Sequence, residues 1–84
     1  MLTKKITVNL KNGLEARPVA MLVQVASRFN SKVYLECADK KVNAKSLIGM
    51  MTLGVVNGEE ITVQTEGEDE ENAMSEVSGF LIGE

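Results

Sequence analysis

A glutamate and an arginine stand at the start of the first predicted helix, where an anion could bind. Arg17 directly precedes Pro18. A residue before proline is disfavoured in the helical conformation, so we expect Arg17 to be extended just outside the helix. The first N–H groups of a helix lack intrahelical partners and lie at the positive end of its dipole, which an adjacent arginine makes into an anion site. Glu15 can itself supply that anion, so a helix start held by a Glu15–Arg17 contact is the simpler alternative.

Ser46 is a candidate phosphorylation site. It stands immediately before the second predicted helix, at the N-cap position, where a serine oxygen accepts a backbone hydrogen bond. Capping alone accounts for a serine there. A phosphoryl group at this position would suit the helix dipole and would add about two negative charges beside an apolar patch. That combination predicts a switch that selects partners.

The second predicted helix carries apolar side chains on more than one face. Leu47, Ile48 and Met51 span about 100° of its circumference, whereas Met50 and Leu53 point the other way. A short helix on a four-stranded sheet buries one of these faces, so we expect the first to be an exposed patch for partners. The alternative is that the helix packs deeply enough against the rest of the protein to bury both faces.

The first predicted helix has a similar surplus. Its core stripe starts with Val19 and Leu22, while Ala20, Met21 and Gln24 lie on or beside the opposite side. This side is either a second part of the partner surface or ordinary surface, since single exposed apolar groups are common.

Composition excludes several classes of function. The chain has 84 residues, a formal net charge of −3, one cysteine and no histidine. Histidine-based catalysis, phosphohistidine and histidine-ligated metals are therefore excluded, and Cys37 alone forms neither an intrachain disulfide nor a metal cluster. Lysines and arginines form no basic stripe for nucleic acid, and no apolar run approaches the ~18 residues of a membrane span. We expect a cytoplasmic protein without metal or cofactor and without nucleic-acid or membrane partners.

Alternating and helical patterns place these residues on a β-α-β-β-α-β-α chain. Because the strands alternate, the sheet is predicted to be largely antiparallel with one wet face, and helices on the dry face complete a two-layer α+β sandwich. Residues 1–84 form one domain. An Asn12-Gly13 turn precedes the first helix, and Asp69 is the predicted cap of the last helix, whose core stripe includes Phe80. The strands are expected at 6–10, 33–37, 41–43 and 61–65, and the first two helices at 18–29 and 46–53.

Two segments resemble motifs of the HPr family, the phosphocarriers of the bacterial sugar phosphotransferase system. The active-site motif resembles NGLEARPVAMLVQ (residues 12–24), and the regulatory serine motif resembles VNAKSLIGMMTLG (residues 42–54). In the family the first motif reads G-[IL]-H-A-R-P, and its histidine carries the phosphoryl group. Here that position is Glu15. The resemblance implies the open-faced sandwich of this family.

A chain that lacks the histidine and keeps the serine is similar to the catabolite-repression branch of the family. That resemblance implies a non-enzymatic regulatory phosphoprotein, phosphorylated on Ser46 by the bifunctional HPr kinase/phosphorylase. The phosphorylated form would then bind catabolite control protein A, a LacI-type regulator, as its corepressor. The partner surface implied by position comprises Arg17, Ala20, Met21, Gln24, Ser46, Leu47, Ile48 and Met51.

Other interpretations of the same residues stay open. A permanent negative charge at Glu15 would either pair with Arg17 and mimic a phosphorylated histidine or repel a phosphoryl group on Ser46. The chain would be a phosphocarrier if Glu15 accepted the phosphoryl group. It would be a binder or inhibitor of a metabolic enzyme if Ser46 served only as a cap. The short N-terminal strand could also swap between two copies.

Overall fold

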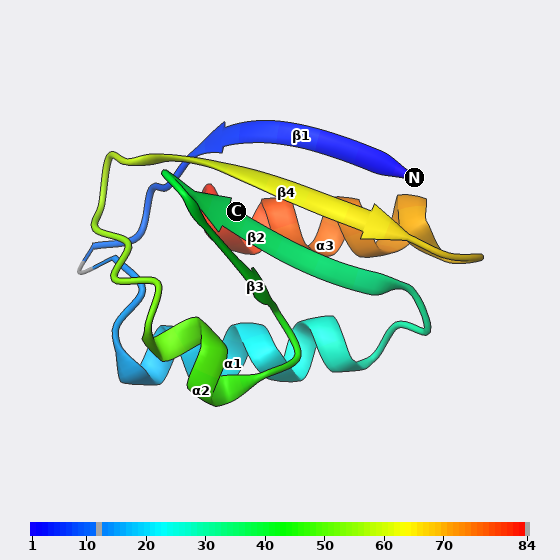
Figure 1. The fold of residues 1–84 in the computed structure, drawn as a ribbon, viewed down its shortest axis with the longest axis horizontal. Coiled ribbons are helices and arrows are strands. Elements are labelled where there is room, and N and C mark those ends of the chain that lie inside the picture. The colour runs from blue at the N-terminus through cyan, green and yellow to red at the C-terminus, as the bar shows by residue number, and fades with distance from the viewer. Residues whose placement is uncertain (12, 84) are drawn as a thin grey trace.

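The computed structural model describes residues 1–11 and 13–83, and its elements follow the predicted order (Figure 1). The strands are β1 (Leu2–Thr7), β2 (Lys32–Cys37), β3 (Lys40–Asn43) and β4 (Glu60–Glu66). The helices are α1 (Ala16–Ser27), α2 (Leu47–Met51) and α3 (Glu70–Leu81).

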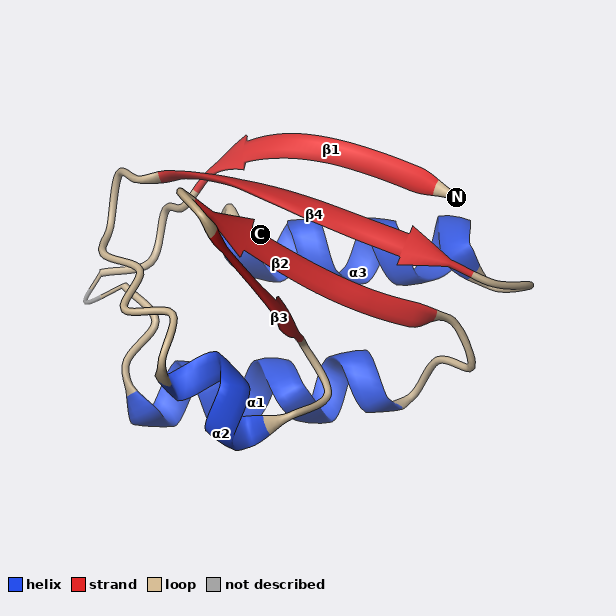
Figure 2. Ribbon diagram, in the orientation of Figure 1, coloured by secondary structure: helices blue, strands red, loops and turns tan. Residues whose placement is uncertain are grey.

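The four strands form one sheet in the order β1-β4-β2-β3, with every neighbouring pair antiparallel. The three helices lie on one side of this sheet (Figure 2). Along β4, Ile61, Val63 and Thr65 are buried and alternate with more exposed residues, because successive side chains of a strand point to opposite faces. The predicted open-faced, two-layer α+β sandwich is confirmed.

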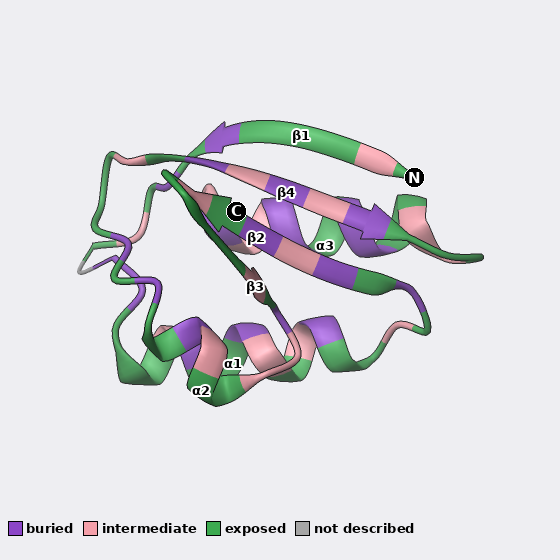
Figure 3. Ribbon diagram, in the orientation of Figure 1, coloured by how far each residue is buried: buried purple, intermediate pink, exposed green. Residues whose placement is uncertain are grey.

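The core lies between the helices and the sheet (Figure 3). On α1 it includes Val19, Leu22 and Ala26. Phe80, predicted in the core stripe of α3, is only half-buried, whereas Met74 and Ser78 are buried. A serine is tolerated there because its hydroxyl donates to the carbonyl of Met74, four residues earlier.

The first strand lies earlier in the chain than the predicted 6–10. Its ladder with β4 runs from Leu2 opposite Thr65 to Thr7 opposite Glu60. The chain leaves the sheet at Asn9, whose N–H donates to the carbonyl of Leu81 at the end of α3 (2.8 Å). The alternation over 6–10 therefore marks the end of the strand and the turn after it.

Asp69 occupies the N-cap position of α3, but the prediction that its side chain caps the helix is wrong. Its carboxylate accepts hydrogen bonds from the N–H groups of Asn30 and Ser31 (each 2.9 Å) and from the Ser31 hydroxyl. The Ser31 hydroxyl first and the Asn30 N–H second lower the pKa of Asp69. The side chain thus joins the loop before β2 to the start of α3.

Candidate functional site

Ser46 caps α2 as predicted. Its Oγ accepts a hydrogen bond from the N–H of Gly49 (3.1 Å), and its carbonyl accepts one from the N–H of Met50 (2.9 Å). The Ser46 backbone is extended (φ −104°, ψ 113°), which is typical of an N-cap residue. The side chain is half-buried at the surface of the molecule.

The two apolar faces of α2 divide as expected. Met50 is fully buried and Leu53 is 7% exposed, whereas Leu47 and Met51 are about half exposed and Ile48 is 80% exposed. The helix ends at Met51, before the predicted 53, so Leu53 enters the core from the following turn. The alternative of a helix buried on both faces is wrong.

Hydrogen bonds from the neighbouring elements hold α2 in place. Lys40 at the start of β3 donates to the carbonyl of Thr52 (3.1 Å), and the Thr52 hydroxyl donates to the carbonyl of Gly49 (2.7 Å). Lys45, next to Ser46, donates to the carbonyl of Phe29 after α1 (2.6 Å). The orientation of the Ser46 segment is therefore fixed from both sides.

The start of α1 corrects one expectation about Arg17. The helix begins at Ala16, so Arg17 lies in its first turn and is not extended outside it. Proline is tolerated at Pro18 because the first N–H groups of a helix have no intrahelical partner to lose. Glu15 takes the N-cap position, and its carbonyl accepts the N–H of Val19 (2.9 Å), but its side chain makes no capping bond.

Glu15 and Arg17 both line a hollow of about 410 Å³ at this helix start, together with Lys11. Within residues 1–11 and 13–83, the structure has one ion pair, between the Met1 ammonium group and Glu70 (3.2 Å). The simpler alternative, a helix start held by a Glu15–Arg17 ion pair, is therefore not formed. Both side chains are exposed.

The segment before Glu15 is attached to the loop that follows α2. The N–H of Leu14 donates to the carbonyl of Val55 (2.9 Å). Gly13 has φ +69°, and a Cβ there would lie 2.6 Å from the Val55 oxygen and 2.7 Å from Val56 Cα. Only glycine fits this close approach. Asn12 of the predicted turn lies outside the described residues.

Helices α1 and α2, which both carry exposed side chains of the predicted partner surface, contact each other (Figure 1). Ala20, Met21 and Gln24 are all exposed on α1. One further apolar side chain was not predicted: Val56, in the loop after α2, is 56% exposed. Val56 follows the buried Val55 directly. Two adjacent valines in a loop do not indicate from the sequence which of them is exposed.

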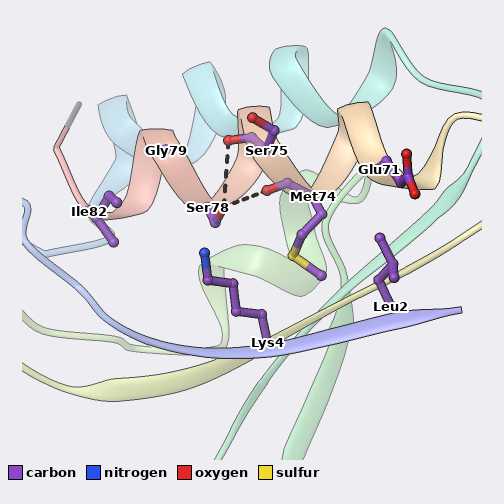
Figure 4. A pocket seen from close by; sticks show the side chains of 8 residues that line it. All are labelled: Leu2, Lys4, Glu71, Met74, Ser75, Ser78, Gly79 and Ile82. Carbon is purple, nitrogen blue, oxygen red and sulfur yellow. Dashed lines mark hydrogen bonds between the residues drawn. The ribbon is translucent and has the colours of Figure 1, made fainter.

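The rest of the described chain offers few other sites. A hollow of about 350 Å³ between β1 and α3 is lined by Leu2, Lys4 and Met74, and none of the predicted site residues reaches it (Figure 4). No three histidine, cysteine, aspartate or glutamate side chains gather into a metal-binding group in residues 1–11 and 13–83. In the same ranges no helix has the length and hydropathy needed to cross a membrane.

Known proteins similar to this chain share its length and its fold. A family model described as "PTS HPr component phosphorylation site" matches residues 2–82. The HPr-like protein Crh of Bacillus subtilis is 48% identical over 81 residues, covering 96% of this chain and 95% of that protein. Crh of Halalkalibacterium halodurans is also 48% identical over 81 residues, covering 96% of each chain.

Solved structures agree with the sequence comparison. The crystal structure of the phosphocarrier HPr of Bacillus anthracis superposes with a TM-score of 0.93 at 44% identity, covering 95% of each chain. A crystal structure of Crh of B. subtilis, described as a dimer with a swapping domain, gives a TM-score of 0.78 at 48% identity. That match covers 96% of this chain and 93% of the Crh chain.

Proposed function

The chain belongs to the HPr family, and on that premise we propose that it is a non-enzymatic regulatory phosphoprotein of carbon catabolite repression. Its Ser46 is the residue phosphorylated by HPr kinase/phosphorylase. In the phosphorylated form it binds catabolite control protein A as a corepressor. The protein acts in the cytoplasm, where these partners are found.

The observation that carries this proposal is the position of Ser46 beside an exposed apolar face. The Ser46 hydroxyl lies at the start of the helix that exposes Leu47, Ile48 and Met51. Monomeric soluble proteins rarely expose large contiguous apolar patches, and an exposed cluster containing methionine suits adaptable contacts with partners. A phosphoryl group on Ser46 would add charge-assisted hydrogen bonds at the edge of that face.

The partner surface that we propose includes both helices. Arg17 supplies a cation in the first turn of α1. The segment just before this helix is hydrogen-bonded to the loop after α2, through the N–H of Leu14 and the carbonyl of Val55. A guanidinium group is well suited to a phosphate because its donors form a planar fork. The full surface comprises Arg17, Ala20, Met21, Gln24, Leu47, Ile48 and Met51.

Phosphorylation by the kinase is tested by intact mass. The wild-type protein, incubated with ATP and HPr kinase/phosphorylase, should gain the mass of one phosphoryl group, and Ser46→Ala should gain none. Ser75→Ala, which changes an exposed serine of α3, is the matched control and should be labelled like the wild type. An unlabelled wild type, or equal labelling of Ser46→Ala, would falsify the proposal.

Glu15 bears on the phosphocarrier alternative. The chain has no histidine, and Glu15 stands in the segment that resembles the active-site motif of the family. A glutamyl phosphate is an acyl phosphate, which water hydrolyses readily, so we propose that the protein is not a competent phosphocarrier. Incubation with phosphoenolpyruvate and enzyme I should leave no hydroxylamine-sensitive label, under conditions that label an ordinary HPr. A label that Glu15→Gln abolishes would establish the carrier function instead.

The second alternative, an unphosphorylated binder of a metabolic enzyme, predicts a different partner assay. Catabolite control protein A should retain the phosphorylated protein and release the unphosphorylated form. Equal retention of an enzyme by the unphosphorylated wild type and by Ser46→Asp would favour the alternative.

We also propose that β1 can exchange between two copies of this chain, as a swapped dimer. The strand lies at the edge of the sheet, where β4 is its single neighbour, and the Crh structure of B. subtilis is described as a swapped dimer. An exchanged strand keeps the same pairing with β4 in the other copy, so its contacts cost little to transfer. Sedimentation velocity should show monomer and dimer exchanging slowly. A monomer alone at every concentration would contradict this.

A further inference from the structure

Gly49 is an unexpected residue for its place in α2. It is the third residue of a helix capped by Ser46, a position at which glutamate or glutamine commonly completes a capping box. Glycine is the least favourable helix residue after proline. The backbone of Gly49 has no positive φ, in contrast to Gly13 and Gly67. The conformational freedom of glycine is therefore not what this position uses.

The missing side chain of Gly49 leaves space beside Ser46 Oγ. A Cβ on Gly49 would lie 3.3 Å from Ser46 Oγ and 3.5 Å from Ser46 Cβ, and the next atom, Val42 Cβ, would be 3.7 Å away. The contact with Oγ is tighter than an ordinary van der Waals contact, whereas the contact with Val42 is ordinary. The N–H of Gly49 meanwhile donates to the same Oγ and fixes its direction.

We infer that Gly49 is a positioning residue for the phosphorylation of Ser46, an inference that rests on the proposed function. Its N–H orients Ser46 Oγ, and its missing side chain leaves that oxygen open to the phosphoryl donor. In the reaction, Oγ forms a bond to the γ-phosphorus of ATP. The bond from that phosphorus to the β–γ bridging oxygen breaks, ADP leaves with the electron pair, and the hydroxyl proton passes to a base of the kinase.

Two glycines allow a matched test. Gly79 lies within α3, and a Cβ there would meet no atom within 4 Å. Alanine favours the helix over glycine, so Gly79→Ala should raise the melting temperature slightly. At Gly49 the tight contact with Ser46 Oγ opposes that gain, so Gly49→Ala should melt at or below the temperature of Gly79→Ala. Gly49→Ala should lower kcat for phosphorylation of Ser46 at least about tenfold, since small misplacements at a reacting atom have large effects on rate. Gly79→Ala should react like the wild type.

Separate values of kcat and KM distinguish two possible effects of the substitution, a change in the access to Ser46 Oγ and a change in how the kinase docks on the surface. Loss of access to the reacting oxygen lowers kcat, with KM within about twofold of the wild type, whereas a weakened docking surface raises KM alone. Gly49→Gln is a second variant, because its longer side chain fills the same space. It gains no capping bond, since the N–H of Ser46 already donates to the carbonyl of Asn43 (3.0 Å). Gly49→Gln should be phosphorylated more slowly than the wild type, with a kcat no higher than that of Gly49→Ala.

Each other outcome overturns the inference in a recognisable way. If the wild type is phosphorylated and both Gly49 variants react at its rate, the empty space has no role and Gly49 is not a positioning residue. If both variants are less stable than the wild type and retain its kcat, glycine serves the packing of α2 against β3 instead. If the wild type itself is not phosphorylated, the proposed function fails and the inference fails with it.

Discussion

Ser46 serves as a structural cap and as the proposed acceptor of a phosphoryl group. In the unmodified protein its Oγ accepts the N–H of Gly49, one of the unpaired donors at the start of α2. Phosphorylation turns that oxygen into an ester oxygen and adds acceptor oxygens beside it. The proposed switch would therefore act on one side chain and on the N–H of Gly49, three residues later.

Loss of the Ser46 cap should be measurable in the folded protein. Ser46→Ala should lower the free energy of unfolding by about 1 kcal/mol, because it leaves the N–H of Gly49 without its acceptor. Urea unfolding followed by circular dichroism measures the difference. Ser75→Ala is the control, since Ser75 is exposed within α3, and it should change stability by less than about 0.5 kcal/mol. Equal effects of the two substitutions would contradict the capping role.

Asp69 should make stability depend on acid pH. Its pKa is lowered in the folded protein, first by the Ser31 hydroxyl and then by the Asn30 N–H. Stability from a lowered carboxyl pKa is fully present above the unfolded pKa of about 4 and is lost as pH falls through the folded pKa. The wild type should therefore be more stable than Asp69→Asn near neutral pH, and the difference should shrink as the pH drops below about 4.

The measurement for Asp69 is urea unfolding of both proteins across this pH range. Asp39→Asn is the matched control, because Asp39 is an exposed aspartate in the turn between β2 and β3. A difference between wild type and Asp69→Asn that stays constant with pH would contradict the assignment. The lowered pKa of Glu70, caused first by the Gly67 N–H, acts in the same window and is present in both proteins.

At the scale of elements, α2 has a buried side and an exposed side, and the adjacent residues Met50 and Met51 lie on different sides. Met51→Ala should weaken binding of the phosphorylated protein to catabolite control protein A by about 1–2 kcal/mol while leaving the fold intact. Met50→Ala should lower the free energy of unfolding by about 2–5 kcal/mol, because Met50 is fully buried. Titration calorimetry and urea unfolding of both variants check the pair. Loss of folding in Met51→Ala would mean that Met51 packs in the core, and it would contradict the assignment of Met51 to the exposed face of α2.

Strand β1 shows how an element can be predicted in kind and misplaced along the chain. Its inward-facing residues, Leu2, Lys4 and Ile6, include a charged side chain that points toward Ser78 of α3 (Figure 4). An inward charge at a sheet edge discourages pairing with another edge strand. It also interrupts the alternation over residues 2–6, and this is why the pattern indicated a strand only from Ile6.

The start of α3 differs from the prediction for another reason. Aspartate directly before a helical pattern predicts a cap, and Asp69 does occupy that position. Its carboxylate instead bonds Asn30 and Ser31, from a loop almost forty residues earlier. Local sequence carries no information about a partner so far away along the chain.

At the scale of the whole molecule, features set by neighbouring residues could be predicted from the sequence, and contacts between distant segments could not. Order and kind of elements follow from local periodicity, and so does the division of α2 into Met50 on one side and Met51 on the other. The bond between Leu14 and Val55, which sets the Glu15 segment against the chain leaving α2, comes from the tertiary fold. The space beside Ser46 Oγ likewise became visible only in the packed structure.

The charge of the whole molecule leads to a prediction about salt. The chain has a formal net charge of −3, and phosphorylation makes it more negative. A complex held partly by phosphate contacts with arginine or lysine should weaken as salt rises, since the screening length falls from about 10 Å at 0.1 M salt to about 3 Å at 1 M. The Kd for catabolite control protein A, measured by titration calorimetry at low and high ionic strength, should increase. Tighter binding in high salt would show that apolar burial alone forms the contact.

The central claim is that phosphorylation of Ser46 selects the regulator, and one titration tests it most directly. Catabolite control protein A is titrated with wild-type protein that carries one phosphoryl group on Ser46, and separately with the unphosphorylated protein. We predict saturable binding of the phosphorylated form and binding at least about a hundredfold weaker without the phosphoryl group, as expected for about 3 kcal/mol from a charge-assisted contact. Equal affinity of the two forms would contradict the claim.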